Sequence, residues 1–105
     1  MEEDAECLEG ASTGMSQLVV MATYDGPANV YACMAACRLK DFPYAGLEGV
    51  LCYCGSAEQV DAGRRRLSRI FFPPTCSYIC KGFEVLPKEQ QLKCGGPLAM
   101  SVYHV

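Results

Sequence analysis

The sequence lacks the features of three large classes of protein. No apolar run approaches the roughly 20 residues of a transmembrane helix, since stretches such as Leu18–Ala22 are far shorter. The chain has no basic excess, and its formal charge of -3 and pI of about 5.0 oppose a dedicated nucleic-acid binder. Its first residues, Met1–Glu6, are acidic where a signal peptide has a basic region followed by an apolar one. The 105 residues therefore predict either a cytosolic domain or a piece of a secreted or surface protein.

The residues of common catalytic sites are also scarce. The only histidine, His104, precedes the last residue, and no Gly-x-Ser-x-Gly nucleophile motif occurs. Acidic residues gather within Glu2–Glu6, where a mobile, solvated terminus is expected rather than the paired acids of a glycoside hydrolase. The sequence predicts no enzyme and no cofactor, and it contains no Asn-x-Ser/Thr acceptor for N-glycosylation.

Cysteine is what the sequence has in excess. Eight cysteines in 105 residues reach the density of a small disulfide scaffold. Zinc is the alternative in a reducing cytosol, but the Cys-x3-Cys and Cys-x-Cys pairs lack the usual Cys-x2-Cys spacing of zinc sites. A disulfide framework without metal is the favoured interpretation. It predicts passage through the secretory pathway to an extracellular or cell-surface location.

Local patterns predict one helix and four short strands. Possible capping residues and Pro27 at 25–29 predict a helix start, and Val30–Lys40 is rich in helix-forming residues before Pro43 ends the segment. Alternation and turn residues predict strands at Ser16–Tyr24, Tyr44–Glu48, Val50–Cys54 and Leu98–His104.

Four cysteines on this helix and the strand that follows have matching spacings. Cys33 and Cys37 are one helical turn apart, a rise of about 5.4 Å, and share a helix face. Cys52 and Cys54 share a strand face and are separated by about 6.6 Å. Two neighbouring disulfides therefore fit between the elements. The sequential pairing, Cys33 with Cys52 and Cys37 with Cys54, is preferred, and the crossed pairing stays open.

The ordered set of motifs resembles a known family, the WSC domain of fungal cell-wall stress sensors, Kremen receptors and polycystin-1. The resemblance runs from Cys7 to Tyr103 and is carried by Cys33-x3-Cys37, Tyr44-Ala45-Gly46-Leu47-Glu48, Cys52-Tyr53-Cys54-Gly55, Cys76-x3-Cys80, Cys94-Gly95-Gly96 and Ser101-Val102-Tyr103.

The resemblance implies a fold and a complete set of disulfides. The implied class is α+β, a small disulfide-rich domain with a helix packed on a short antiparallel sheet, similar to PAN/apple domains. Residues 1–6 would be a flexible N-terminus and residues 7–105 the domain. Besides Cys33–Cys52 and Cys37–Cys54, the family pattern implies Cys7–Cys76 and Cys80–Cys94.

Two tyrosines are candidates for contacting a ligand. A sugar site needs an aromatic face with polar groups around it. Tyr53 lies between two inward-facing cysteines and should point outward, and Tyr78 lies between Cys76 and Cys80. Partial burial against the sheet is the alternative interpretation for both.

Four arginines form a second candidate site. Arg64, Arg65, Arg66 and Arg69 are predicted to lie in a long loop, where their guanidinium groups suit an anionic glycan or an acidic partner. The alternatives are a solvated loop and a loop that is cleaved by proteases.

These observations predict an extracellular, non-catalytic binding module of a larger secreted or membrane-anchored protein. The resemblance implies recognition of a glycan or a cell-wall polysaccharide. The alternative is a protein–protein interaction or spacer domain of a receptor or adhesion protein. Nucleic-acid binding, metal binding and membrane insertion of this segment are not expected.

Overall fold

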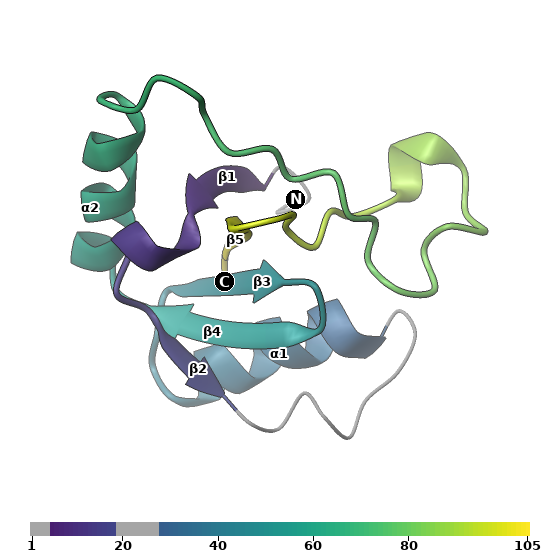
Figure 1. Cartoon of the computed structure of the whole chain (residues 1–105). Helices are drawn as coiled ribbons and strands as arrows, with labels where there is room; N and C mark the ends of the chain where they lie inside the picture. Colours follow the sequence, from purple (N-terminus) through teal and green to yellow (C-terminus); the bar gives the residue numbers. More distant parts are fainter. Residues whose placement is uncertain (1–4, 19–27) are drawn as a thin grey trace.

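A five-stranded antiparallel sheet forms the centre of the molecule (Figure 1). The computed structural model describes residues 5–18 and 28–105. The strand order is β1-β5-β3-β4-β2, and the strands are β1 (Glu6–Glu9), β2 (Ser16–Leu18), β3 (Tyr44–Glu48), β4 (Leu51–Gly55) and β5 (Ala99–His104).

The predicted strands at 44–48, 50–54 and 98–104 are confirmed to within one residue. Of the strand predicted at 16–24, positions 16–18 form β2 and positions 19–24 lie outside the described residues. Glu6, the last residue of the segment expected to be flexible, is the first residue of β1.

The predicted helix is α1, which spans Ala28–Leu39. The expected start at 25–27 lies outside the described residues. Asp41, at φ 63°, takes the left-handed conformation typical of helix ends, and the Phe42 N–H donates to the Cys37 carbonyl at 2.9 Å. The chain then turns into β3, which brings the two inward cysteines of α1 over the sheet.

A second helix, α2 (Ala57–Leu67), corrects the prediction of an arginine loop. Ser56 and Gln59 form a capping box: the Gln59 N–H donates to Ser56 Oγ at 3.3 Å, and the Ser56 N–H donates to Gln59 Oε1 at 2.9 Å. Arg64, Arg65 and Arg66 therefore occupy the last turns of a helix, where positive charge is favoured by the helix dipole. The loop prediction was wrong because it weighed the charge of the segment and missed the capping signal in front of it.

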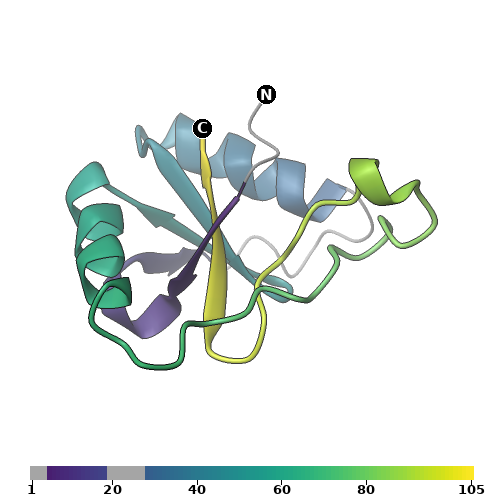
Figure 2. The same cartoon turned by 90° about the horizontal axis from the view of Figure 1, so that it is seen from above.

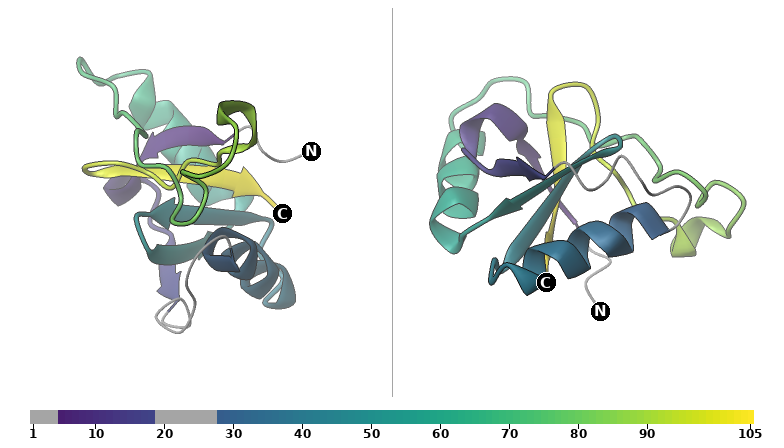
Figure 3. Two further views of the ribbon diagram at one scale, coloured as in Figure 1. Left: turned by 90° about the vertical axis from the view of Figure 1, so that its right-hand side faces the viewer. Right: turned by 90° about the horizontal axis from the view of Figure 1, so that it is seen from below.

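The two helices cover opposite faces of the sheet (Figures 2 and 3). Residues alternate along β3, so Ala45 and Leu47 face the cluster under α1 while Gly46 faces the cluster that contains Val60 of α2. Short 3-10 helices occur at Gly10–Ser12 (η1) and Lys88–Gln90 (η3). The α+β, disulfide-rich class predicted from the sequence is confirmed.

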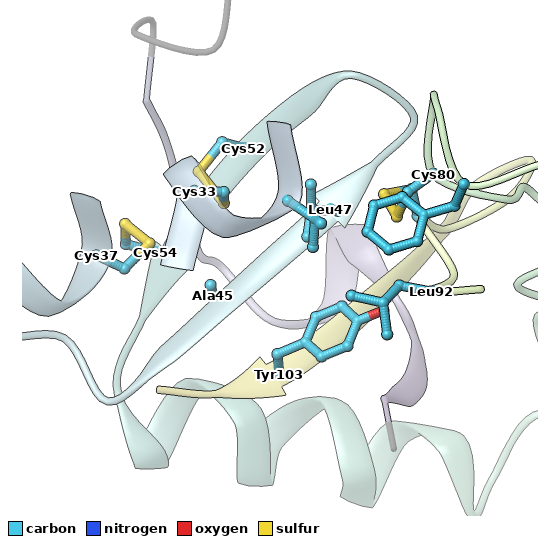
Figure 4. Close-up of a cluster of buried hydrophobic side chains, with 12 residues drawn as sticks. Cys33, Cys37, Ala45, Leu47, Cys52, Cys54, Cys80, Leu92 and Tyr103 are labelled. Carbon is cyan, nitrogen blue, oxygen red and sulfur yellow. A yellow bond between two sulfur atoms is a disulfide. The ribbon is translucent and has the colours of Figure 1, made fainter. Parts of the chain in front are cut away.

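Four disulfides link these elements, and they are the pairs that the family resemblance implies. They join Cys7 to Cys76, Cys33 to Cys52, Cys37 to Cys54, and Cys80 to Cys94, with Cα–Cα distances of 5.7, 5.6, 5.3 and 4.9 Å. The two bridges of α1 lie side by side over the sheet, next to Ala45 (Figure 4). The sulfurs of Cys33, Cys37 and Cys52 lie within 4.8 Å of one another, and all three are bonded as disulfides rather than available as thiolates.

Within the described ranges, no helix is long and apolar enough to cross a membrane.

Candidate functional site

An open groove lies where β3 and β4 meet the turn after β1. It has a volume of about 420 Å³ and is lined by Glu9, Gly10, Ala11, Gly14, Met15, Glu48, Tyr53 and Leu98. Four separate segments contribute these residues: the end of β1 with η1, the loop before β2, the β3–β4 hairpin, and the turn before β5. We call this the Tyr53 groove.

Tyr53 provides the aromatic surface of the groove. Cys52 and Cys54 of β4 point towards α1, so the alternation of the strand turns Tyr53 to the opposite face, as the sequence predicts. There the ring is partly buried against the cluster of Leu8, Met100 and Val102 and still lines the groove. Burial, with the nearby charge of Glu48 as a second cause, raises the pKa of the Tyr53 hydroxyl. The ring is thus fixed by packing, and its hydroxyl stays protonated.

Glu48 provides a carboxylate beside this ring. The side chain is partly buried, and within the described part of the chain no hydrogen bond or ion pair reaches its oxygens. Desolvation raises the pKa of this carboxyl group. The carboxylate lies against Gly10, where a side chain on residue 10 would collide with it. An acceptor of this kind, in a groove and without an internal partner, is suited to contacting a ligand.

Glu9 is the other acidic residue of the groove, and it is held differently. Its carboxylate accepts hydrogen bonds from the Ser12 hydroxyl and, at 3.4 Å, from Arg66 Nε of α2. The Ser12 hydrogen bond is the main reason that the pKa of Glu9 is lowered, and Arg66 contributes further. Glu9 is therefore a fixed, ionised group at the edge of the groove.

Helix α2 holds the wall of the groove in place. Gln59 Nε2 donates a 2.7 Å hydrogen bond to the Gly14 carbonyl, which joins the capping box of α2 to the lining segment. Gly63 allows the helix to approach closely, because a Cβ at this position would lie 2.9 Å from Thr13 Cγ2 and 3.0 Å from Leu8 Cδ1. The sequence analysis named none of these supporting residues. The signal that could have found them is the Ser56–Gln59 capping box.

Leu98 closes the groove at the turn before β5. It is 85% exposed and takes a left-handed conformation, with φ of 57°. Hydrogen bonds between Gly96 and Ala99, at 3.0 and 3.1 Å, fix this turn. A leucine with positive φ is strained, and such strain is concentrated at functional sites.

The second candidate tyrosine lies elsewhere. Tyr78 is 47% exposed and lines a separate hollow of about 310 Å³ with Gly49, Val50, Ile79, Lys81 and Cys94. This hollow shares no lining residue with the Tyr53 groove. The structure therefore does not unite the two tyrosines in one site.

The four arginines divide into two pairs. Arg64 donates to both oxygens of Glu6 through Nε and Nη2, at 2.8 and 2.5 Å, and through Nη1 to Asp61 at 2.8 Å. These contacts, with Glu6 the largest cause, raise the pKa of Arg64, and they tie α2 to β1. Arg66 is in contact with Glu9. For the side chains of Arg65 and Arg69, no partner is found within the described residues. None of the four lines the Tyr53 groove.

Of the residues that line the groove, the sequence predicts only Tyr53, and those it misses include Glu48, Met15 and Leu98. For Glu48 a signal existed, because period two along β3 puts it on the same sheet face as Gly46, whose partner on β4 is Tyr53. For Met15 and Leu98 no local signal exists, since only the tertiary fold brings their loops to the hairpin.

A disulfide-rich α+β domain with an open, partly aromatic groove is typical of extracellular binding modules. Comparison with known proteins defines the family: the WSC domain matches residues 5–96, and this chain belongs to that family. Human Kremen protein 2 is 40% identical over 78 residues, which cover 72% of this chain and 14% of that protein. No solved structure matches the chain significantly. Family membership and the four disulfides support an extracellular or cell-surface module of the receptor type.

Proposed function

We propose that this WSC domain is a non-catalytic carbohydrate-binding module and that the Tyr53 groove is its site. The observation that carries the proposal is the position of Tyr53 beside the Glu48 carboxylate, which has no partner among the described residues, in an open groove. The parent protein would be a larger secreted or membrane-anchored protein, since the chain spans only 14% of the length of Kremen protein 2.

The chemistry of the groove suits a pyranose ring. The C–H face of a sugar is apolar and packs on an aromatic ring, while its hydroxyl groups need acceptors and donors at the edge. Tyr53, Met15 and Leu98 supply apolar surface, and Glu48 and Glu9 supply acceptors. The groove is open to the surface. An open groove can bind an internal segment of a long polysaccharide, whereas an enclosed pocket admits only its end.

Titration calorimetry with glycans selected on an array tests this proposal. Tyr53→Ala should weaken binding about tenfold, at the lower end of the roughly 1–3 kcal/mol that a nucleobase stacked on an aromatic side chain contributes. Tyr53→Phe should bind like the parent sequence, since the ring remains. Tyr78→Ala is the matched control at the second candidate tyrosine. Full binding by Tyr53→Ala, or a loss caused by Tyr78→Ala alone, would rule out the Tyr53 groove as the site.

A protein-interaction function is the second candidate, and an exposed apolar patch favours it. Phe71 and Phe72 are 89% and 83% exposed, with ring centroids 5.0 Å apart and an interplanar angle of 82°. Beside them, a hollow of about 370 Å³ is lined by Phe72, Leu98 and the prolines of the α2–β5 connection, Pro73, Pro74 and Pro97. Large exposed apolar patches mark interaction surfaces.

This second function is tested by measuring whether the other domains of the parent protein, each produced separately, bind to the WSC domain. Phe71→Ser with Phe72→Ser should abolish their association with the WSC domain and leave glycan titrations unchanged. Arg65 and Arg69 remain candidates for contacting an acidic partner, and Arg65→Ser with Arg69→Ser should weaken only a salt-dependent association. If both double variants associate as tightly as the unchanged domain, neither the two phenylalanines nor the two arginines belong to the interface.

A further inference from the structure

The charged residues of the Tyr53 groove are all acidic. Glu9 and Glu48 line it, and no lysine, arginine or histidine does. An anionic glycan would therefore place its sulfate or carboxylate groups near the partly buried Glu48 carboxylate, where like charges repel, whereas the charge of Glu9 is offset by Arg66. The groove opposes the anionic ligands that the arginine segment suggests.

Glu48 is the groove residue whose hydrogen bonding to a ligand should strengthen binding most. Its carboxylate has lost part of its hydration and gains no hydrogen bond from the described residues in return. A neutral hydroxyl group can donate one hydrogen bond to it. An ammonium group donates up to three and also neutralises the charge, and such charge-assisted bonds are roughly twice as strong as neutral ones.

The position of Glu48 next to the aromatic ring specifies what carries this ammonium group. Tyr53 and Glu48 lie on paired strands and line the same groove, so one ligand can contact both residues. A pyranose ring packed on Tyr53 with an amino substituent at its edge meets both requirements. The Glu48 carboxylate itself fills the space above Gly10, which has no side chain to displace it, so the carboxylate is held at the edge of the groove.

We infer that the Tyr53 groove selects glycans with free amino groups, such as oligomers of glucosamine, over their N-acetylated and sulfated counterparts. This inference rests on the proposed carbohydrate-binding function and adds the class of sugar. An N-acetyl group removes the positive charge and two of the three donors from the nitrogen, so the acetylated oligomer keeps at most one neutral hydrogen bond to Glu48.

Calorimetric titration of the whole domain with the glucosamine hexamer and the N-acetylglucosamine hexamer tests the inference. The free amine should bind about tenfold more tightly, as expected for one hydrogen bond between charged groups. Glu48→Gln keeps the shape of the side chain and removes its charge, so it should reduce this ratio to about one, with a much larger loss of affinity for the free amine than for the acetylated hexamer. Glu58→Gln, an exposed acid of α2 outside the groove, is the matched control and should leave both affinities unchanged.

Each other outcome is informative. Equal affinity for the two hexamers would overturn the selectivity and leave the proposed function intact. A tenfold ratio that persists in Glu48→Gln would overturn the inference that Glu48 causes the selectivity. Absence of binding to any glycan would overturn both. Tri-lysine is the control for a bare cation: if it binds as tightly as the glucosamine hexamer, the groove recognises only an amine charge and the sugar is not its ligand.

Discussion

Glu48 and Tyr53 lie on neighbouring antiparallel strands and line the same groove, and the Glu48 charge adds to the effect of burial in raising the pKa of Tyr53. Neither residue belongs to the disulfide framework that defines the family pattern. Cys52 and Cys54, on either side of Tyr53, anchor β4 to α1 and so fix where the ring points. The framework thereby positions a site on the face of the sheet opposite to itself.

Glu48→Gln should stabilise the domain at neutral pH. Burial raises the pKa of Glu48 in the folded state above its ordinary value of 4.5, so the folded state binds this proton more tightly than the unfolded state. The contribution of Glu48 to stability therefore falls as pH rises through 4.5 and stays unfavourable at pH 7. The group is partly exposed, so the gain should be below about 1 kcal/mol. Urea unfolding at about pH 4 and pH 7 measures it, and a less stable variant at pH 7 would show that Glu48 has a stabilising partner.

Leu98→Gly should also stabilise the domain, by up to about 1 kcal/mol. Leu98 has φ of 57° in an exposed turn, a conformation that costs a leucine about 1 kcal/mol or more and a glycine little. The flexibility that glycine adds to the unfolded chain offsets part of this gain. The same change should weaken ligand binding, because Leu98 lines the groove. Thermal unfolding and glycan titration of one sample measure both effects, and a variant that loses stability would contradict the assignment of strain.

Ser56→Ala should destabilise the domain by about 1 kcal/mol through loss of the α2 capping box. Ser68→Ala, at the other end of α2, is the matched control, since Ser68 Oγ donates only to the Arg65 carbonyl on the exposed surface. Hydrogen exchange should quicken in the first turn of α2 and at Met15, because Gln59 links the cap to Gly14. Equal effects of the two serines would mean that the box does not support the groove wall.

Ionisation of the Tyr103 hydroxyl should lower the free energy of unfolding of the domain at high pH. Burial raises the pKa of Tyr103 to about 12, and its hydroxyl donates to the Lys93 carbonyl at 2.5 Å. The unfolded value is about 10, so the contribution of Tyr103 is complete below pH 10 and is lost as pH rises from about 10 to 12. Tyr103→Phe should remove this decline and cost about 1 kcal/mol at pH 7, since the Lys93 carbonyl loses its donor. Brief urea unfolding between pH 8 and 11 compares the two proteins, and parallel declines would assign the effect to other groups.

The sequence predicts the disulfide core well for a physical reason. Cys33, Cys37, Cys52 and Cys54 lie within 22 positions of one another, so local spacing and periodicity constrain how α1 and β4 face each other. For the outer bridges the family resemblance alone supplied the pairs, because Cys76, Cys80 and Cys94 lie outside helices and strands, where no periodicity relates their side chains.

The groove is harder to predict because it is assembled from distant segments. Tyr53 was identified from strand alternation alone, whereas Glu48 was read as part of a structural motif. Leu98 reaches the groove only because β5 is inserted between β1 and β3 in the sheet. The arginine segment shows the opposite error: a run of charge suggested a loop, and the capping residues before it determine a helix.

Chemical-shift mapping of the ¹⁵N-labelled domain during titration with the glucosamine hexamer tests the Tyr53 groove most directly. The largest saturable changes should occur at the backbone amides of the lining segments and be lost in Tyr53→Ala; these segments are Glu9–Ala11, Gly14–Met15, Glu48, Tyr53 and Leu98. Changes concentrated at Tyr78 and Ile79, or at Phe71 and Phe72, with the groove amides unmoved, would contradict this prediction.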